Sequence, residues 1–178
     1  MDKIFWVDLE MTGLNHEEHV IIEFASIITD MHFRALDTYE TVIYQPQSEL
    51  DKMGEWCVKT HGDSGLTMKV RHGKPLDEVE RVILEKLEQH FPEEAPILAG
   101  NSIYQDRRFI DRYMPLLSKK LHYRMLDVSS FKIMFMHKFN RGFAKKETHR
   151  ALDDINESIL ELRFYLDFVD TKRMKGKS

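Results

Sequence analysis

The stretch Ile4-Phe5-Trp6-Val7-Asp8-Leu9-Glu10 sets two carboxylates directly behind a run of four bulky apolar residues. Such a run is typical of a buried strand, and a strand alternates its side chains, so Asp8 and Glu10 point to the same face. A charge at the end of a central strand is costly to bury without a partner, and no lysine or arginine lies nearby in the sequence. We therefore predict that a cation sits between these two acids.

Two later stretches supply further carboxylates: Gly100-Asn101-Ser102-Ile103-Tyr104-Gln105-Asp106 and His149-Arg150-Ala151-Leu152-Asp153-Asp154. Taken singly, Asp106 and Asp154 are better explained as helix caps, charged first-turn residues or solvated surface groups. Together with the first two acids they form a set of four oxygen ligands, which suits hard divalent ions such as Mg²⁺ or Mn²⁺. Two such ions, about 3.5–4 Å apart, form the clamp with which enzymes displace a phosphodiester oxygen. The pattern predicts a metal-dependent nuclease.

A histidine precedes the last of these acids by five residues. On one continuous helix, residues five apart point about 140° away from each other, so His149 and Asp154 meet at one site only if His149 lies in the loop before the helix. A loop histidine with a pKa near neutrality is suited to taking a proton from water. The alternative for a lone histidine here is a capping or solvated loop residue.

Strand patterns and helical patterns alternate along the chain after three initial strands. Apolar or alternating runs predict strands at Ile4–Leu9, Ile21–Thr29, Tyr39–Tyr44, Ile97–Ala99 and Tyr123–Val128. Helical spacing follows Pro75, follows Ser102 and occupies the end of the chain. This order predicts an α/β fold with a single mixed five-stranded sheet and helices on both faces.

Two helices have more specific signals. Ser102, followed three residues later by Gln105, has the form of a capping box, so a helix is expected to begin there. The last helix has the clearest apolar stripe, with residues stepping by four and three: Ile155, Ile159, Leu162, Leu166 and Val169.

The 178 residues are expected to form one domain over residues 1–170, followed by a basic, disordered tail at residues 171–178. The single cysteine, Cys57, suits a reducing cytosol, and no apolar run is long enough to span a bilayer, so we predict a cytoplasmic protein. The net charge is −4, from 26 basic and 30 acidic residues. Proteins that hold long nucleic acids usually carry a basic stripe. None is visible here outside the tail, so a nucleic-acid substrate should be short.

Longer blocks of the sequence resemble a known family. They are Trp6-Val7-Asp8-Leu9-Glu10-Met11-Thr12-Gly13-Leu14, Gly100-Asn101-Ser102-Ile103-Tyr104-Gln105-Asp106-Arg107-Arg108-Phe109, Tyr123-Arg124-Met125-Leu126-Asp127-Val128-Ser129 and His149-Arg150-Ala151-Leu152-Asp153-Asp154. They closely resemble the oligoribonuclease family, in the DEDDh branch of the RNase H-like 3′→5′ exonucleases. The similarity runs from Ile4 to Phe168 and implies the RNase H-like form of the predicted sheet.

The resemblance also implies an activity and an assembly. Members of this family are homodimers that degrade RNA of a few nucleotides, above all dinucleotides, to mononucleotides. By this resemblance the chain would hold two divalent ions, Mg²⁺ or Mn²⁺, through Asp8, Glu10, Asp106 and Asp154. His149 would act as the general base for the attacking water.

The resemblance further implies substrate contacts. Leu14 would wedge between the two bases, while Trp56 and His61 would line the base pocket. The 5′ end of the dinucleotide would be capped by Ser102 and Gln105, with Tyr123, Arg124 and Ser129 from the other subunit. Several of these residues also have a simpler explanation: Trp56 as a core residue, Ser102 and Gln105 as a helix cap, and Arg124 beside Tyr123 as an edge-strand pair.

Two other functions stay open at this point. One is a DEDDh exonuclease that trims longer single strands of DNA or RNA, against which the lack of a basic stripe argues. The other is a non-catalytic RNase H-like module that binds nucleotides or a partner protein. The intact acidic quartet with His149 argues against that module, because a chain released from catalysis need not keep all five residues.

Overall fold

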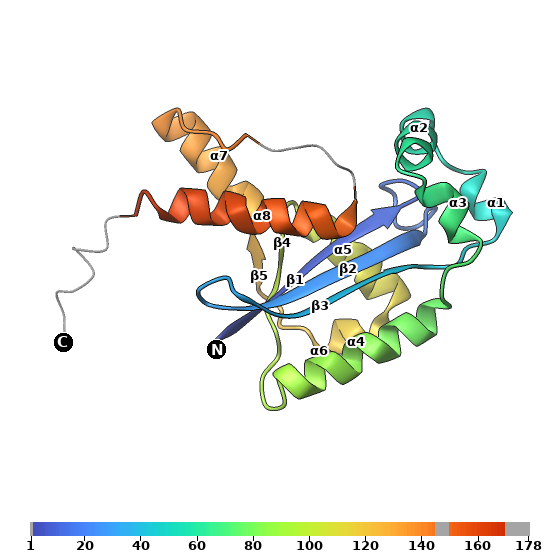
Figure 1. Ribbon diagram of the computed structural model, residues 1–178, viewed down its shortest axis with the longest axis horizontal. Coiled ribbons are helices and arrows are strands. Elements are labelled where there is room, and N and C mark those ends of the chain that lie inside the picture. Colours follow the sequence, from blue (N-terminus) through green and yellow to red (C-terminus); the bar gives the residue numbers. More distant parts are fainter. Residues whose placement is uncertain (1, 145–149, 170–178) are drawn as a thin grey trace.

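A mixed sheet forms the centre of the computed structural model, which describes residues 2–144 and 150–169 (Figure 1). Its strands are β1 (Lys3–Met11), β2 (Ile21–Asp30), β3 (Ala35–Val42), β4 (Leu98–Gly100) and β5 (Met125–Asp127). The order is β3-β2-β1-β4-β5, with β1, β2 and β3 antiparallel and β4 and β5 parallel to β1. The predicted mixed five-stranded sheet is confirmed.

Eight helices surround this sheet in the described residues. They are α1 (Gln47–Leu50), α2 (Glu55–Asp63), α3 (Leu66–Val70), α4 (Leu76–His90), α5 (Tyr104–Tyr113), α6 (Pro115–Lys120), α7 (Val128–Phe139) and α8 (Ala151–Leu166). Figure 1 shows α7 and α8 over one face of the sheet and α4, α5 and α6 over the other, with α1 to α3 gathered past the end of β1. Helices on both faces are therefore confirmed. Within the described residues, no helix combines the length and apolarity that crossing a membrane requires.

The alternation of β1 divides the core into two layers. Phe5, Val7 and Leu9 belong to the cluster beneath α4, α5 and α6, while Ile4 and Trp6 belong to the cluster beneath α7 and α8. Trp6 is fully buried, and its indole N–H donates to Thr29 Oγ1 at 3.0 Å. The apolar half of the opening stretch therefore fixes β1 from both sides and leads straight into the two acids.

Several predicted strand bounds, and the end of the predicted stripe of the last helix, were wrong. The third strand ends at Val42 rather than Tyr44, because the chain there turns to pair with Lys74: the Tyr44 N–H donates to the Lys74 carbonyl at 2.9 Å. The stripe of the last helix continues through Tyr165 instead of Leu166, which is exposed. The final turn of α8 faces α7, where the Tyr165 ring packs 4.9 Å from that of Phe135.

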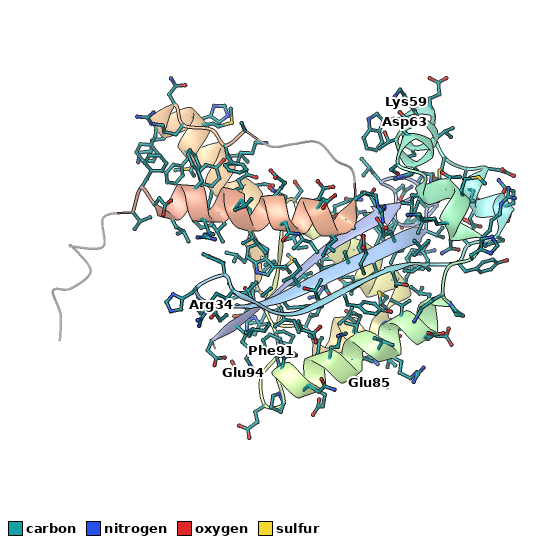
Figure 2. The ribbon with its side chains drawn as sticks, viewed as in Figure 1. Arg34, Lys59, Asp63, Glu85, Phe91 and Glu94 are labelled. Atoms are coloured by element: carbon teal, nitrogen blue, oxygen red, sulfur yellow. The ribbon has the colours of Figure 1, made fainter. Side chains whose placement is uncertain are left out.

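Charged side chains away from the sheet form local pairs of opposite sign on the outer surface. Lys59 and Asp63 on α2 pair at 2.6 Å and point away from the molecule, whereas Phe91, at the end of α4, is buried in the core (Figure 2). Arg34, on the turn between β2 and β3, pairs with Asp30 at 2.6 Å. Such exposed pairs contribute little to stability.

Candidate active site

Three carboxylates meet at one end of β1. Asp8 and Glu10 project from the same side of this strand, and Asp154 projects from the first turn of α8. One oxygen atom of each lies within 4.8 Å of the others. Such a spacing suits a shared divalent cation, because hard ions accept several carboxylate oxygens at short range. The structure thus brings together three of the four acids that the sequence singled out.

Asp106 lies in the same cleft but outside this group of three. It sits in the first turn of α5, is buried, and accepts a hydrogen bond from the Leu9 N–H at 3.0 Å. That bond ties α5 to β1 between Asp8 and Glu10. Burial raises the pKa of Asp106 from 3.8 to about 7, opposed by its backbone hydrogen bonds and assisted by Asp127. A fourth oxygen donor therefore borders the three-carboxylate group.

The electrostatics of Glu10 show the cost of this arrangement. Burial and the charges of Asp154, Glu23 and Asp106 together raise its pKa from 4.5 to about 8, although Arg150 acts to lower it. Crowded carboxylates favour protonation, and a bound divalent cation reverses this preference by stabilising the ionised form. The site is therefore more favourable with a hard cation bound than without one at neutral pH.

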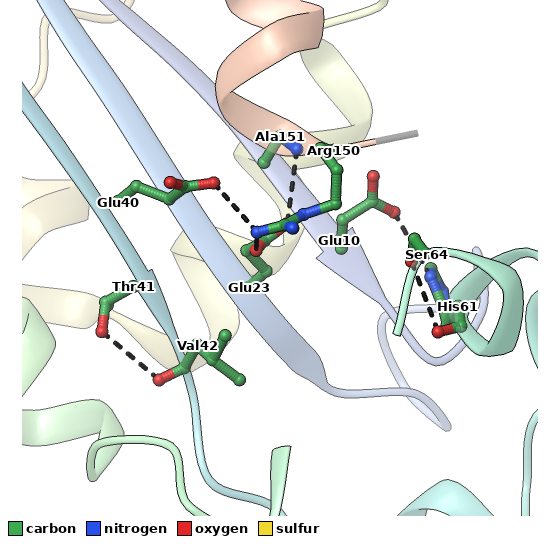
Figure 3. A network of polar contacts seen from close by, with 9 residues as sticks. All are labelled: Glu10, Glu23, Glu40, Thr41, Val42, His61, Ser64, Arg150 and Ala151. Atoms are coloured by element: carbon green, nitrogen blue, oxygen red, sulfur yellow. Dashed lines mark hydrogen bonds and ion pairs between the residues drawn. The ribbon is translucent and has the colours of Figure 1, made fainter. Parts of the chain in front are cut away.

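Two charged residues near this site were missed in the sequence. Glu23 on β2 lies directly opposite Glu10 and is fully buried, and Arg150 contacts it from the start of α8 (Figure 3). A signal for Glu23 was present, since it is a charge inside the apolar run Ile21–Thr29. Arg150 gave no such signal, because only the fold brings it to β2.

His149 lies outside the described residues, as does the tail at residues 171–178. The helix that follows begins at Ala151, with Arg150 in extended conformation at its N-cap position (φ −130°, ψ 126°). The role of His149 as a general base stays a prediction.

A cleft of about 400 Å³ adjoins the acids. Its lining residues are Asp8, Leu9, Glu10, Met11, Gly13, Leu14, Trp56, Cys57, His61, Asn101, Ser102, Gln105 and Asp106. Leu14 and Trp56 are 75% and 63% exposed, so both offer apolar surface to a ligand. The simpler explanation of Trp56 as a core residue is therefore wrong, and the core tryptophan is Trp6.

His61 connects α2 to the end of β1. Its ring is buried, with Nε2 2.9 Å from the Met11 carbonyl oxygen and Nδ1 3.8 Å from Glu10 Oε2. Beside it, burial and the charge of Glu10 raise the pKa of the Cys57 thiol. A raised pKa disfavours the thiolate, so Cys57 is poorly suited to act as a nucleophile here.

The predicted capping box of α5 is wrong. The helix begins at Tyr104 with Ile103 at the N-cap, and no side-chain cap forms among the described residues. Ser102 instead adopts a left-handed conformation (φ 51°), and its N–H donates to Asp127 Oδ1 at 3.0 Å. The side-chain amide of Gln105 donates to the Leu14 carbonyl, which joins α5 to the loop after β1. Both side chains therefore face the cleft rather than their own helix.

Ser129 differs from its expected placement on a second subunit. Its hydroxyl lies 3.1 Å from that of Ser102 in the same chain and donates to Asn101 Oδ1 at 3.0 Å. These contacts form because Asp127, at the end of β5, caps α7 through the Ser129 N–H at 2.9 Å. The first turn of α7 therefore places Ser129 against Asn101 and Ser102, two lining residues of the cleft in its own chain.

Tyr123 and Arg124 do not line this cleft. They precede β5 instead of belonging to it, so the predicted strand start and the edge-strand explanation were both wrong. Tyr123 is largely exposed, with Arg124 5.1 Å above one side of its ring and His122 stacked at 4.5 Å. The pair forms a projecting aromatic and cationic surface.

Comparisons with known proteins show the class of protein. A family model for exonucleases, RNase_T, matches residues 5–162. An oligoribonuclease of Francisella tularensis subsp. tularensis (strain WY96-3418) is 47% identical over 167 residues, which cover 92% of this chain and 94% of the relative. An oligoribonuclease of Photobacterium profundum is 45% identical over 173 residues, covering 94% and 96%.

Solved exonucleases share the fold. Exonuclease I from Methylocaldum szegediense superposes with a TM-score of 0.75 at 14% identity, and Exonuclease I of E. coli with a dA16 oligonucleotide gives 0.71 at 12%. The matches cover 94% and 97% of this chain, which spans only 41% and 42% of those proteins. Likeness at this identity concerns the fold alone and confirms the RNase H-like prediction. The sequence relatives, matched over nearly their full length, decide the rest: the chain belongs to the oligoribonuclease family of exonucleases.

Proposed function

We propose that this protein is a 3′→5′ exoribonuclease that hydrolyses short oligoribonucleotides, dinucleotides above all, to nucleoside 5′-monophosphates. The observation that carries the proposal is the group of Asp8, Glu10 and Asp154, whose oxygens lie within 4.8 Å of one another. Beside it, the cleft presents an exposed leucine and an exposed tryptophan. Relatives named oligoribonuclease, at 45–47% identity, support the same substrate class.

Two divalent ions, Mg²⁺ or Mn²⁺, would be held by Asp8, Glu10, Asp106 and Asp154. When bound, such ions activate water as a nucleophile and stabilise the charge that develops on the phosphate. The chain contributes the geometry: Asp106 is fixed to β1 through the Leu9 N–H, and Asp154 is fixed by the helix that carries it. His149 would take the proton of the attacking water.

Leu14 and Trp56 would position the bases. An aromatic face binds any base by stacking, which contributes about 1–3 kcal/mol per base. His61, held by the Met11 carbonyl, would close the base pocket behind Trp56. Ser102, Gln105 and Ser129 would form the polar end of the cleft that receives the 5′ nucleotide.

A homodimer would complete the 5′ end with Tyr123 and Arg124 of the neighbouring subunit. Exposed apolar side chains on α7 support this assembly, because Ile133, Met134 and Phe139 are each more than half exposed. Large exposed apolar patches mark interaction surfaces. The segment with Tyr123 and Arg124 lies just before β5 and α7, so a dimer formed through α7 would carry both residues to the interface.

A length series tests the substrate. The purified protein would be incubated with labelled RNAs from dinucleotide to decanucleotide, with Mn²⁺ or with excess chelator. We expect the highest kcat/KM on dinucleotides and no hydrolysis in excess chelator. Arg124→Ala should lower kcat/KM more on the dinucleotide than on a pentanucleotide. Equal efficiency at all lengths would favour the long-strand trimmer, and binding without hydrolysis would favour the non-catalytic module.

Subunit mixing tests the dimer. Heterodimers of Asp8→Ala and Arg124→Ala subunits should recover activity, because one of their two sites keeps both residues. Absence of recovery in heterodimers shown to form would mean that each subunit works alone. The cytoplasmic location, inferred from the single cysteine, stays a prediction.

A further inference from the structure

Glu23 is a buried charge that the proposed chemistry does not use. It is 0% exposed, sits on β2 and does not line the cleft. Its carboxylate accepts three hydrogen bonds: from Arg150 Nη2 at 2.8 Å, from Arg150 Nε at 3.3 Å and from the Ala151 N–H at 3.3 Å (Figure 3). The three donors belong to Ala151, the first residue of α8, and to Arg150, the residue before it.

These contacts lead to a proposed metal ligand in two steps. Glu23 holds the guanidinium of Arg150, and the Arg150 carbonyl accepts the Asp154 N–H at 3.0 Å. The Ala151 N–H, which has no partner within its own helix, is satisfied by the same carboxylate. Asp154 therefore belongs to a helical turn whose start is attached to β2.

Stability alone does not account for this ion pair. Replacing a buried pair by apolar residues is often neutral, since desolvation offsets the attraction between the charges. The apolar side of α8, with Ile155, Ile159 and Leu162 buried against the sheet, already holds the helix. The pair instead fixes an orientation. The two contacts of Glu23 with the planar Arg150 guanidinium define how the first turn of α8 lies on β2.

We propose that Glu23 is a positioning residue for catalysis, fixing through Arg150 the turn that carries Asp154 against the strand that carries Asp8 and Glu10. Metal-binding constellations require placement within about 0.5 Å. In the sequence Arg150 also directly follows His149, so the same attachment fixes the point at which the segment with the predicted base enters α8. The inference rests on the proposed function, because it assumes that Asp154 holds a metal ion.

Glu23→Gln tests the inference, since it keeps the volume and one acceptor but removes the charge. We expect kcat on a dinucleotide to fall by about 10- to 100-fold, as is typical when a partner of a metal ligand is lost. KM should stay within about threefold, because the base pocket is untouched. Calorimetric titration of the metal-free protein with Mn²⁺ should show weaker binding. A purely structural role would lower the melting temperature and leave the kcat of the folded fraction and its Mn²⁺ affinity unchanged.

Glu40→Gln is the matched control. Glu40 contacts the same Arg150 nitrogen at 3.1 Å, but its side chain is 34% exposed. Loss of this exposed partner should change kcat by less than about twofold. Equal effects of Glu23→Gln and Glu40→Gln, or a Glu23→Gln enzyme with wild-type kcat, would overturn the inference.

A second variant covers the case in which Glu23→Gln does not fold. Arg150→Lys keeps the cation but loses the two-contact geometry, so kcat should fall while KM is retained; an unchanged kcat would count against the inference. The Mn²⁺ titration separates this inference from the proposed function. If wild type bound Mn²⁺ but did not cleave RNA, the proposed function would fail, while weaker Mn²⁺ binding by Glu23→Gln would still support positioning.

Discussion

One face of the β1–β2 pair is apolar at one end and acidic at the other, although α8 covers both ends. At the apolar end, Ile4 and Trp6 pack with Ile27 beneath the middle of α8. Further along β1, Asp8 and Glu10 occupy the next two positions of the same alternation. The backbone pairing continues unchanged through both halves, so only the side chains differ.

The helix repeats this division. Its first turn brings Asp154 to the acidic end, while Ile159 and Leu162, further along, pack on the apolar end. The acidic end is electrostatically unfavourable, since the pKa of Glu10 is raised to about 8. The apolar end shows no such conflict, and it supplies burial that holds the acids together. One helix can therefore be held by the apolar half of a sheet face while it brings a carboxylate to the acidic half of the same face.

The largest expected effect comes from removing an acid. Asp8→Ala should lower kcat by orders of magnitude, because the shared metal site loses a ligand. The metal-free variant should be at least as stable as wild type, since repulsion among the carboxylates is relieved. Activity assays with Mn²⁺ and urea unfolding in chelator would measure the two effects. A variant that retains most of its activity would remove Asp8 from the metal site.

The opposite result is expected two residues earlier on the same strand and face. Trp6→Ala should cost about 3–5 kcal/mol of unfolding free energy, because it empties a fully buried site. The kcat of the remaining folded enzyme should change little, since Trp6 does not line the cleft. Urea unfolding followed by circular dichroism, with kcat corrected for the folded fraction, would check this. A loss of kcat as deep as that of Asp8→Ala would erase the distinction between the two halves.

The acidic half should also give the metal-free protein an unusual pH dependence. The pKa of Glu10 is raised from 4.5 to about 8 by folding, and that of Asp106 from 3.8 to about 7. The folded state therefore binds protons that the unfolded state has released, so stability is present at low pH and lost as pH rises. In chelator, the melting temperature should fall between about pH 5 and about pH 8.

Two controls sharpen this result. Mn²⁺ should abolish the fall, because the cation stabilises the ionised carboxylates and binds only the folded state. Glu10→Gln should flatten the dependence of the metal-free melting temperature on pH. It removes the carboxyl whose pKa is the higher of the two raised values. A metal-free melting temperature that rises over this range would contradict the electrostatic description of the acidic half.

The sequence predicted the two halves unequally. The buried start of β1 was evident from its apolar run. The shared face of the two acids after it was evident from alternation, because residues two apart in a strand point to the same side. The contacts of α8 were harder, since Glu23 and Arg150 lie 127 positions apart and meet only after the sheet and helix have packed. The same reason explains Ser102 and Gln105. Their spacing satisfies a local capping pattern, yet the fold offers them Ser129 and Leu14 as partners instead.

The smallest effect is expected at Ile155, which directly follows Asp154 where the two halves of α8 meet. Ile155→Val removes one buried methylene and should cost about 0.5–1.5 kcal/mol of unfolding free energy. Its kcat should stay within about twofold of wild type, because the remaining apolar contacts and the Glu23–Arg150 pair still place the first turn. Asp154→Asn, one position earlier, should show the reverse: almost no activity and unchanged or higher metal-free stability. If Ile155→Val lowered kcat more than it lowered stability, the apolar half would itself be setting the metal site, and the boundary between the halves would lie further along α8.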